Sequence, residues 1–259
     1  MALQTGAGGA QGEALLACIL DMGELLLVSG AEVRRVEDTL TRLCAAYGFE
    51  RADVFTITSS IVLTAAAPGG RVLTQTRRIR ERRTDLGCVE RVNGLSRRLC
   101  AQPLALAGLR RAVEEVRQGR AYPPWVQCAA YAVVSAAFTV FFGGAARDAL
   151  AAALSGALLA GALALGRRLP LGDLLLNLLC SAFAALAAAA LAALGVGVSP
   201  EKIIIGNIML LIPGLGLTVS LRDMIGGDTI SGLLGLCEAV LKALAVAAGF
   251  AVVLLRAGG

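Results

Sequence analysis

The sequence predicts a membrane protein in which an N-terminal cytosolic α+β domain precedes an α-helical bundle of five transmembrane helices. The 259 residues are 57% apolar, which is more than a typical soluble domain contains. Charge is also unevenly distributed: residues 1–120 hold 17 Lys and Arg with 13 Asp and Glu, whereas residues 121–259 hold 7 and 6. We therefore predict a polar domain over residues 1–120 and a transport-type membrane domain over residues 121–259, divided near Tyr122-Pro123-Pro124-Trp125.

The polar domain contains both helical and strand patterns. Apolar residues at helical spacing predict helices over Glu13–Val28, from Val33 to about Gly48, and roughly over Leu86–Cys100 and Leu104–Gln118. Ser29 and Glu32 have the spacing of a capping box for the second of these helices. Residues 52–66 and 71–79 are rich in Val, Ile, Thr and Phe and flank the turn sequence APGG, which predicts strands joined by a hairpin there.

The membrane domain divides into apolar segments separated by polar loops. The predicted spans are Val126–Phe142, Ala149–Leu165, Leu174–Leu194, Ile203–Val219 and Ile230–Leu255. If the arginine-rich first 120 residues are cytoplasmic, five spans place Arg167, Arg168 and Arg222 on the same side. This bias predicts a cytoplasmic N-terminus and a C-terminus outside the cell.

Several classes of function are not expected from this sequence. It has no histidine, and its seven cysteines are scattered without a CxxC pair, so we expect no metal site and no cofactor. The polar domain has no GxSxG or GxxxxGK[ST] motif, so an enzyme is not expected. The basic residues lie beside membrane spans, where the positive-inside rule explains them, so we expect no nucleic-acid partner. The N-terminus lacks the basic n-region of a signal peptide.

The fourth span is short and interrupted by helix breakers. Pro213 removes a backbone donor, and Gly214 adds flexibility beside it. Broken spans in transporters present half-helix ends to charged substrates, although a kink that serves only packing is the alternative. Asn207 is a polar group in the same span.

Four segments resemble the threonine/serine exporter (ThrE) family: SGAEVRRVEDTLTRL, RVNGLSRRL, YPPW and IIIGNIMLLIPGLGLTVSLRDMIGGDTISG. The chain is most similar to the larger subunit of the split, two-component form. The resemblance implies proton-coupled export of threonine and serine, or of a succinate-like dicarboxylate, across a bacterial plasma (inner) membrane. It also implies a partner, a small membrane subunit of about 150 residues that supplies a second bundle, or else a homo-oligomer. The alternatives are a membrane-anchored hydrolase-type enzyme and a membrane scaffold that transports nothing.

The remaining candidate residues lie in these motifs or in the last span. Arg222, Asp223 and Asp228 surround a Gly-Gly hinge and suit a gate or a substrate clamp, although surface charges that only set topology are the alternative. Thr218 and Ser231 are candidate polar contacts in the same motif. Asn207 stands where the family usually has a small residue. Glu238 and Lys242 are four residues apart in the last span, which suits proton coupling or a structural ion pair. Glu32, Arg35 and Glu37 form the cytosolic motif, with either a salt bridge or a gating contact expected.

Overall fold

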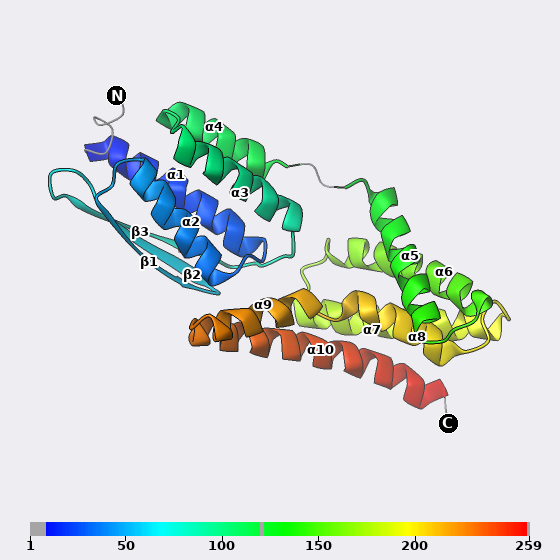
Figure 1. Ribbon diagram of the computed structural model, residues 1–259. Helices are drawn as coiled ribbons and strands as arrows, with labels where there is room; N and C mark the ends of the chain where they lie inside the picture. Colours follow the sequence, from blue (N-terminus) through cyan, green and yellow to red (C-terminus); the bar gives the residue numbers. More distant parts are fainter. Residues whose placement is uncertain (1–8, 120–121, 258–259) are drawn as a thin grey trace. The chain divides into compact units, whose positions relative to one another are not determined.

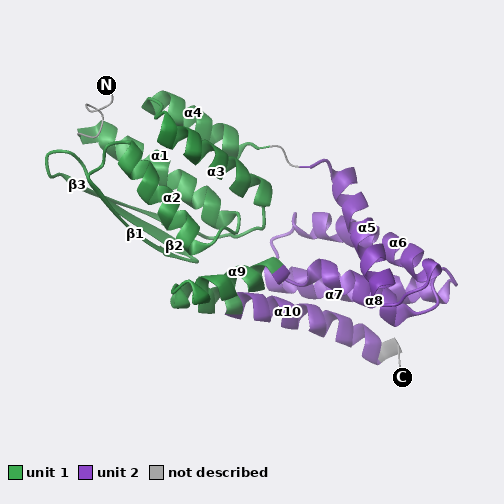
Figure 2. Cartoon of the chain, in the orientation of Figure 1, with its two compact units in different colours: residues 1–120, 215–236 green, residues 121–214, 237–259 purple. Residues whose placement is uncertain are grey.

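The computed structural model describes residues 9–119 and 122–257, which form two compact units (Figure 2). We call residues 1–120 together with 215–236 the polar unit, and residues 121–214 together with 237–259 the membrane unit. The units differ from the two expected domains in one segment. Residues 215–236, which the sequence analysis places in the membrane domain, pack with the N-terminal residues.

The N-terminal part of the polar unit is built in three layers (Figure 1). A three-stranded antiparallel sheet in the order β1-β2-β3 is covered by α1 and α2, and α3 and α4 pack on those helices. The elements are α1 (Gly9–Val28), α2 (Val33–Ala46), β1 (Arg51–Ile57), β2 (Ser60–Ala66), β3 (Val72–Arg78), α3 (Leu86–Ala101) and α4 (Leu106–Arg117).

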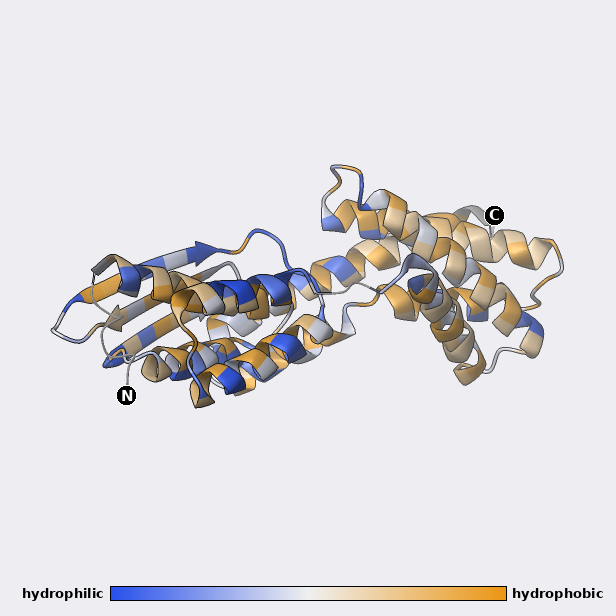
Figure 3. Cartoon of the chain, turned by 90° about the horizontal axis from the view of Figure 1, so that it is seen from above, coloured by the Kyte–Doolittle hydropathy of each residue, from blue (hydrophilic) through white to orange (hydrophobic). Residues whose placement is uncertain are grey.

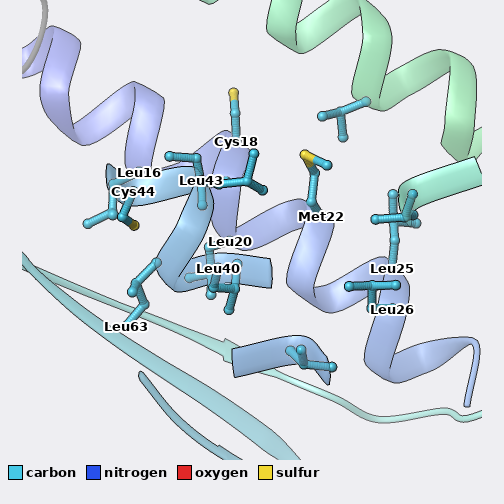
Figure 4. Close-up of a cluster of buried hydrophobic side chains, with 14 of the residues drawn as sticks. Leu16, Cys18, Leu20, Met22, Leu25, Leu26, Leu40, Leu43, Cys44 and Leu63 are labelled. Atoms are coloured by element: carbon cyan, nitrogen blue, oxygen red, sulfur yellow. The ribbon is translucent and has the colours of Figure 1, made fainter. Parts of the chain in front are cut away.

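The core of this part lies between the sheet and the helices. Leu16, Leu20, Leu40 and Leu43 extend from α1 and α2 toward Leu63 of β2 (Figure 4). Alternate residues of β2 are buried, because one face of a half-covered strand points into the core. The apolar periodicity of the sequence therefore identifies the face that each element buries.

The strand prediction was incomplete between residues 52 and 66. This stretch contains two strands, β1 and β2, joined by a tight turn at Thr58-Ser59, and Ile57 pairs with Ser60. The turn has none of the Gly, Asn or Pro residues that usually mark one, so composition alone does not locate it. The predicted turn at APGG is present between β2 and β3.

The predicted capping box at Ser29 is wrong. The residue before α2 is Glu32, whose side chain makes no capping bond, and the Ser29 hydroxyl is buried without a hydrogen-bond partner. Ser29 instead belongs to the end of α1, which closes at Gly30 with a positive φ of 88°. The start of α2 therefore needs a partner from elsewhere in the chain.

The membrane unit is a bundle of apolar helices (Figure 3). The helices after the polar domain are α5 (Pro124–Phe141), α6 (Ala146–Gly166), α7 (Asp173–Ala193), α8 (Pro200–Leu211), α9 (Gly214–Ile225) and α10 (Thr229–Ala257). Among the described residues, α5, α6, α7 and α10 are long and apolar enough to cross a membrane. The pair α8 and α9, bent by 49°, makes a fifth candidate if it is one span. The chain is thus a multi-pass membrane protein with four or five candidate spans.

Close packing in the bundle depends on small residues. A Cβ on Gly156 of α6 would lie 2.8 Å from the backbone oxygen of Tyr131, and one on Gly206 of α8 would lie 2.6 Å from that of Ser135. Helices in lipid associate closely where such residues face one another. Gly156 and Gly206 are therefore close-packing positions of the bundle.

Candidate functional site

α9 and the first turns of α10 form a hairpin, here called the α9–α10 hairpin (residues 215–236). Gly227, with a φ of 101°, ends α9 in a conformation that favours glycine, and the Asp228 N–H donates to the Asp223 carbonyl 2.9 Å away. The two helices then pack closely, because a Cβ on Gly232 would lie 2.6 Å from the Ser220 backbone oxygen. The glycines of the motif thus build a compact hairpin.

Asp223 connects this hairpin to the N-terminal part of the polar unit. Its carboxylate Oδ1 accepts a hydrogen bond from the backbone N–H of Val33 at 3.1 Å, and Asp223 is only 6% exposed. Val33 is the first residue of α2, so Asp223 caps a helix 190 residues away in the chain. A carboxylate is well suited to this position, because a helix N-terminus carries partial positive charge and unpaired N–H groups.

Two further contacts hold the hairpin in the same place. The Arg222 guanidinium lies 2.8 Å from Glu32 Oε1, and the Ser231 hydroxyl donates to the Thr56 carbonyl at 3.3 Å. Arg35 approaches the same Glu32 oxygen only to 3.8 Å, so Arg222 is the closer partner of Glu32. The structure therefore brings the cytosolic motif and the residues after the fourth span together.

Glu37 lies beside this contact. Its Oε1 accepts the backbone N–H of Thr56 at 2.9 Å, on the residue whose carbonyl binds Ser231. Burial raises the pKa of Glu37, the hydrogen bond from Thr56 opposes that rise, and the negative charge of Asp228 adds to it. Asp228 is thus close enough to influence the charge of Glu37.

The predicted break is present in the chain between α8 and α9. α8 ends at Leu211, Ile212 is extended, and α9 begins at Gly214 directly after Pro213. Thr218 lies in the second turn of α9. Extended backbone before a proline is the expected conformation.

Asn207 lies inside the membrane unit. It is fully buried, accepts a hydrogen bond from Ser135 at 2.8 Å and donates one to Ser155 at 2.7 Å. It therefore links α5, α6 and α8. Its place in a packed network favours a structural role in the bundle.

The possible ion pair between Glu238 and Lys242 is not formed. Lys242 Nζ lies 3.2 Å from Oδ2 of Asp173, the first residue of α7, and Glu238 is exposed without an ion pair in the part of the chain that the structure describes. Lys242 thus lies near the end of the bundle where α7 begins. Glu238 precedes it by about 6 Å along α10.

The sequence identifies the motif residues in these contacts, but it does not identify the groups that they bind. The N–H of Val33 and the carbonyl of Thr56 are backbone groups that carry no sequence signature. Ser135 and Thr139 do carry one, since two small polar residues four apart in an apolar span mark one helix face. Asp173 lies one residue before the predicted third span, Leu174–Leu194.

Taken together, the apolar bundle, the interrupted span and the hairpin held on a polar domain define a transporter-type membrane protein. A family model described as "Putative threonine/serine exporter" matches residues 17–256. The chain belongs to this threonine/serine exporter (ThrE) family, a family of transporters. No curated protein and no solved structure was found to match it.

Proposed function

We propose that this chain is the larger subunit of a two-component exporter that moves threonine and serine out of the cytoplasm, driven by the proton gradient. Membership of the exporter family supports the substrate class. The observation that carries the mechanism is the bond from the Val33 N–H to Asp223, because it attaches a segment beside the broken span to the polar unit. Arg222 and Ser231 add to this attachment.

In the proposed mechanism, the α9–α10 hairpin acts as a gate. It is joined to α8 at Pro213-Gly214, where the helix is interrupted, and polar contacts hold it on the N-terminal part of the polar unit. A segment with a break at one end and few polar contacts at the other can move as a unit. The end of α8 and the start of α9 supply oriented backbone groups that suit the ammonium and carboxylate of an amino acid.

The proposed arrangement places the N-terminus in the cytoplasm and the C-terminus outside a bacterial inner membrane. An odd number of spans supports a second bundle, supplied by a small membrane subunit of about 150 residues or by another copy of the chain. A reporter fused to the C-terminus tests this topology. A cytoplasmic signal from that reporter would contradict the five-span arrangement.

Transport measurements test the function directly. The chain and the small subunit are reconstituted together in proteoliposomes with a pH gradient, and the export of threonine, serine and succinate is compared. We expect transport of the two hydroxy amino acids and a strong reduction in the double variant Pro213→Ala, Gly214→Ala, which repairs the helix. Gly161→Ala is the matched control, since a Cβ there meets no atom within 4 Å.

Four results would reject parts of this proposal. Absence of transport of all three substrates would reject the exporter function, and transport of succinate alone would reject the hydroxy amino acid as substrate. Full activity in the double variant would show that the break at Pro213-Gly214 serves only helix packing and not transport. Equal transport by the chain alone and with the small subunit would remove the requirement for that partner.

A further inference from the structure

A groove lies between α2 and α3 on the polar unit, and Glu32, the partner of Arg222, is among its lining residues. These two helices pack against each other, and the groove along their polar edges has a volume of about 660 Å³. Its lining includes Arg34, Arg35 and Arg42 from α2 and Asn93, Ser96 and Arg97 from α3. Such a volume suits a small metabolite.

Helical spacing explains why these side chains converge. Arg35 and Arg42 are seven residues apart on α2, and Asn93 and Arg97 are four apart on α3, so each pair lies on one face of its helix. The opposite faces carry the buried core residues of the same helices. The arginines therefore line the groove because the apolar faces of both helices are turned into the core.

The charges in the groove do not balance. Asp38 pairs with Arg42 at 2.9 Å, and Glu32 lies closer to Arg222 than to Arg35. Within residues 9–119 and 122–257, the structure gives Arg34 and Arg97 no ion pair. Four guanidinium groups face two carboxylates, so the groove is electropositive.

We propose that this groove binds the phosphate group of a small phosphate monoester. Guanidinium groups present planar forks of N–H donors that match phosphate oxygens, and several of them at one site favour a doubly charged anion. The Asn93 amide and the Ser96 hydroxyl lie in the same lining and can bind hydroxyl groups on the rest of the ligand. The site does not depend on the proposed transport function.

The neighbouring groove between α3 and α4 shows that the α2–α3 lining is distinctive. It is lined largely by apolar residues such as Leu95, Leu99 and Leu104, although Arg98 and Arg111 also belong to it. Both grooves therefore contain arginine side chains, but those of the α3–α4 groove lie among apolar residues. This provides a matched control for a binding experiment.

The test is isothermal titration of the full-length protein in detergent with glycerol 3-phosphate. We expect saturable binding by the wild type and at least about tenfold weaker binding by Arg34→Gln, Arg97→Gln, since charge-assisted hydrogen bonds contribute strongly. The charge-matched variant Arg98→Gln, Arg111→Gln should bind within about twofold of the wild type, because it leaves the groove intact. Arg97→Lys keeps the charge but loses the fork and should bind with intermediate affinity.

A second arm distinguishes a free metabolite from a lipid headgroup. Titrations are repeated in nanodiscs of phosphatidylcholine with and without phosphatidic acid. Unchanged binding identifies a soluble ligand, whereas competition by phosphatidic acid identifies a lipid headgroup at the same phosphate site. Absence of glycerol 3-phosphate binding up to about 10 mM in detergent would overturn the proposal, as would equal weakening by both double variants.

Discussion

Replacing Asp223 with alanine should release the start of α2. The substitution leaves the Val33 N–H, on a residue that is 1% exposed, without its acceptor. An unpaired buried donor costs about 1–3 kcal/mol, and loss of a negative charge at a helix N-terminus adds about 0.3–1 kcal/mol. Since 1.4 kcal/mol is a factor of ten, amide exchange around Val33 should become roughly 10- to 1000-fold faster.

Hydrogen–deuterium exchange with mass spectrometry measures this effect on peptides that contain Val33. Asp228→Ala removes an equal charge from the same hairpin, and the structure gives its side chain no bond to α2, so it is the control. Asp223→Asn keeps an acceptor oxygen and should have a smaller effect than Asp223→Ala. Unchanged exchange in Asp223→Ala, or equal acceleration in Asp228→Ala, would refute the assignment of Asp223 as the cap.

Two further predictions concern packing and protonation. Gly206→Ala should destabilise the bundle by about 1–3 kcal/mol, because its Cβ would lie 2.6 Å from the Ser135 backbone oxygen. Gly161→Ala should be nearly neutral, and thermal unfolding in detergent compares the two variants. The pKa of Glu37 is raised, so the folded state holds the Glu37 proton more tightly than the unfolded state does. The contribution of Glu37 to stability is therefore present below its ordinary pKa of 4.5 and is lost as pH rises through the folded pKa. Glu37→Gln should remove this part of the pH dependence, and an unchanged profile would show that another group causes it.

Local patterns predicted much of the secondary structure. Helix boundaries in the polar domain follow from apolar periodicity, and the span boundaries follow from the polar loops. The turn between β1 and β2 was missed because Thr58-Ser59 has no Gly, Asn or Pro to mark it within a continuous strand-like stretch. In these cases the information lies within a few residues of the feature.

The contacts of the candidate site could not be predicted in the same way. The sequence identified Glu32, Arg222 and Asp223 as motif residues, but a bond between residues 33 and 223 leaves no local pattern. Ser29 and Glu32 even had the spacing of a local cap, which the end of α1 overrides. Tertiary packing therefore decides which of several chemically reasonable partners a charged residue takes.

The surroundings of the carboxylates bear on where a coupling proton could act. Glu238 is exposed near one end of the bundle, and Asp173 pairs with Lys242. Asp148 is buried but accepts hydrogen bonds from three backbone N–H groups, which is the environment of a structural cap.

Asp223 is different, because its carboxylate accepts a backbone N–H across the contact between the α9–α10 hairpin and the N-terminal part of the polar unit. Glu37 accepts the N–H of Thr56 within the N-terminal part, on the residue whose carbonyl binds Ser231 of the hairpin. Protonation of Asp223 would weaken a bond that holds the hairpin, since the ionised form is the stronger acceptor. If export is coupled to protons as proposed, protonation of Asp223 would therefore act on the proposed gate directly rather than through a relay inside the last span.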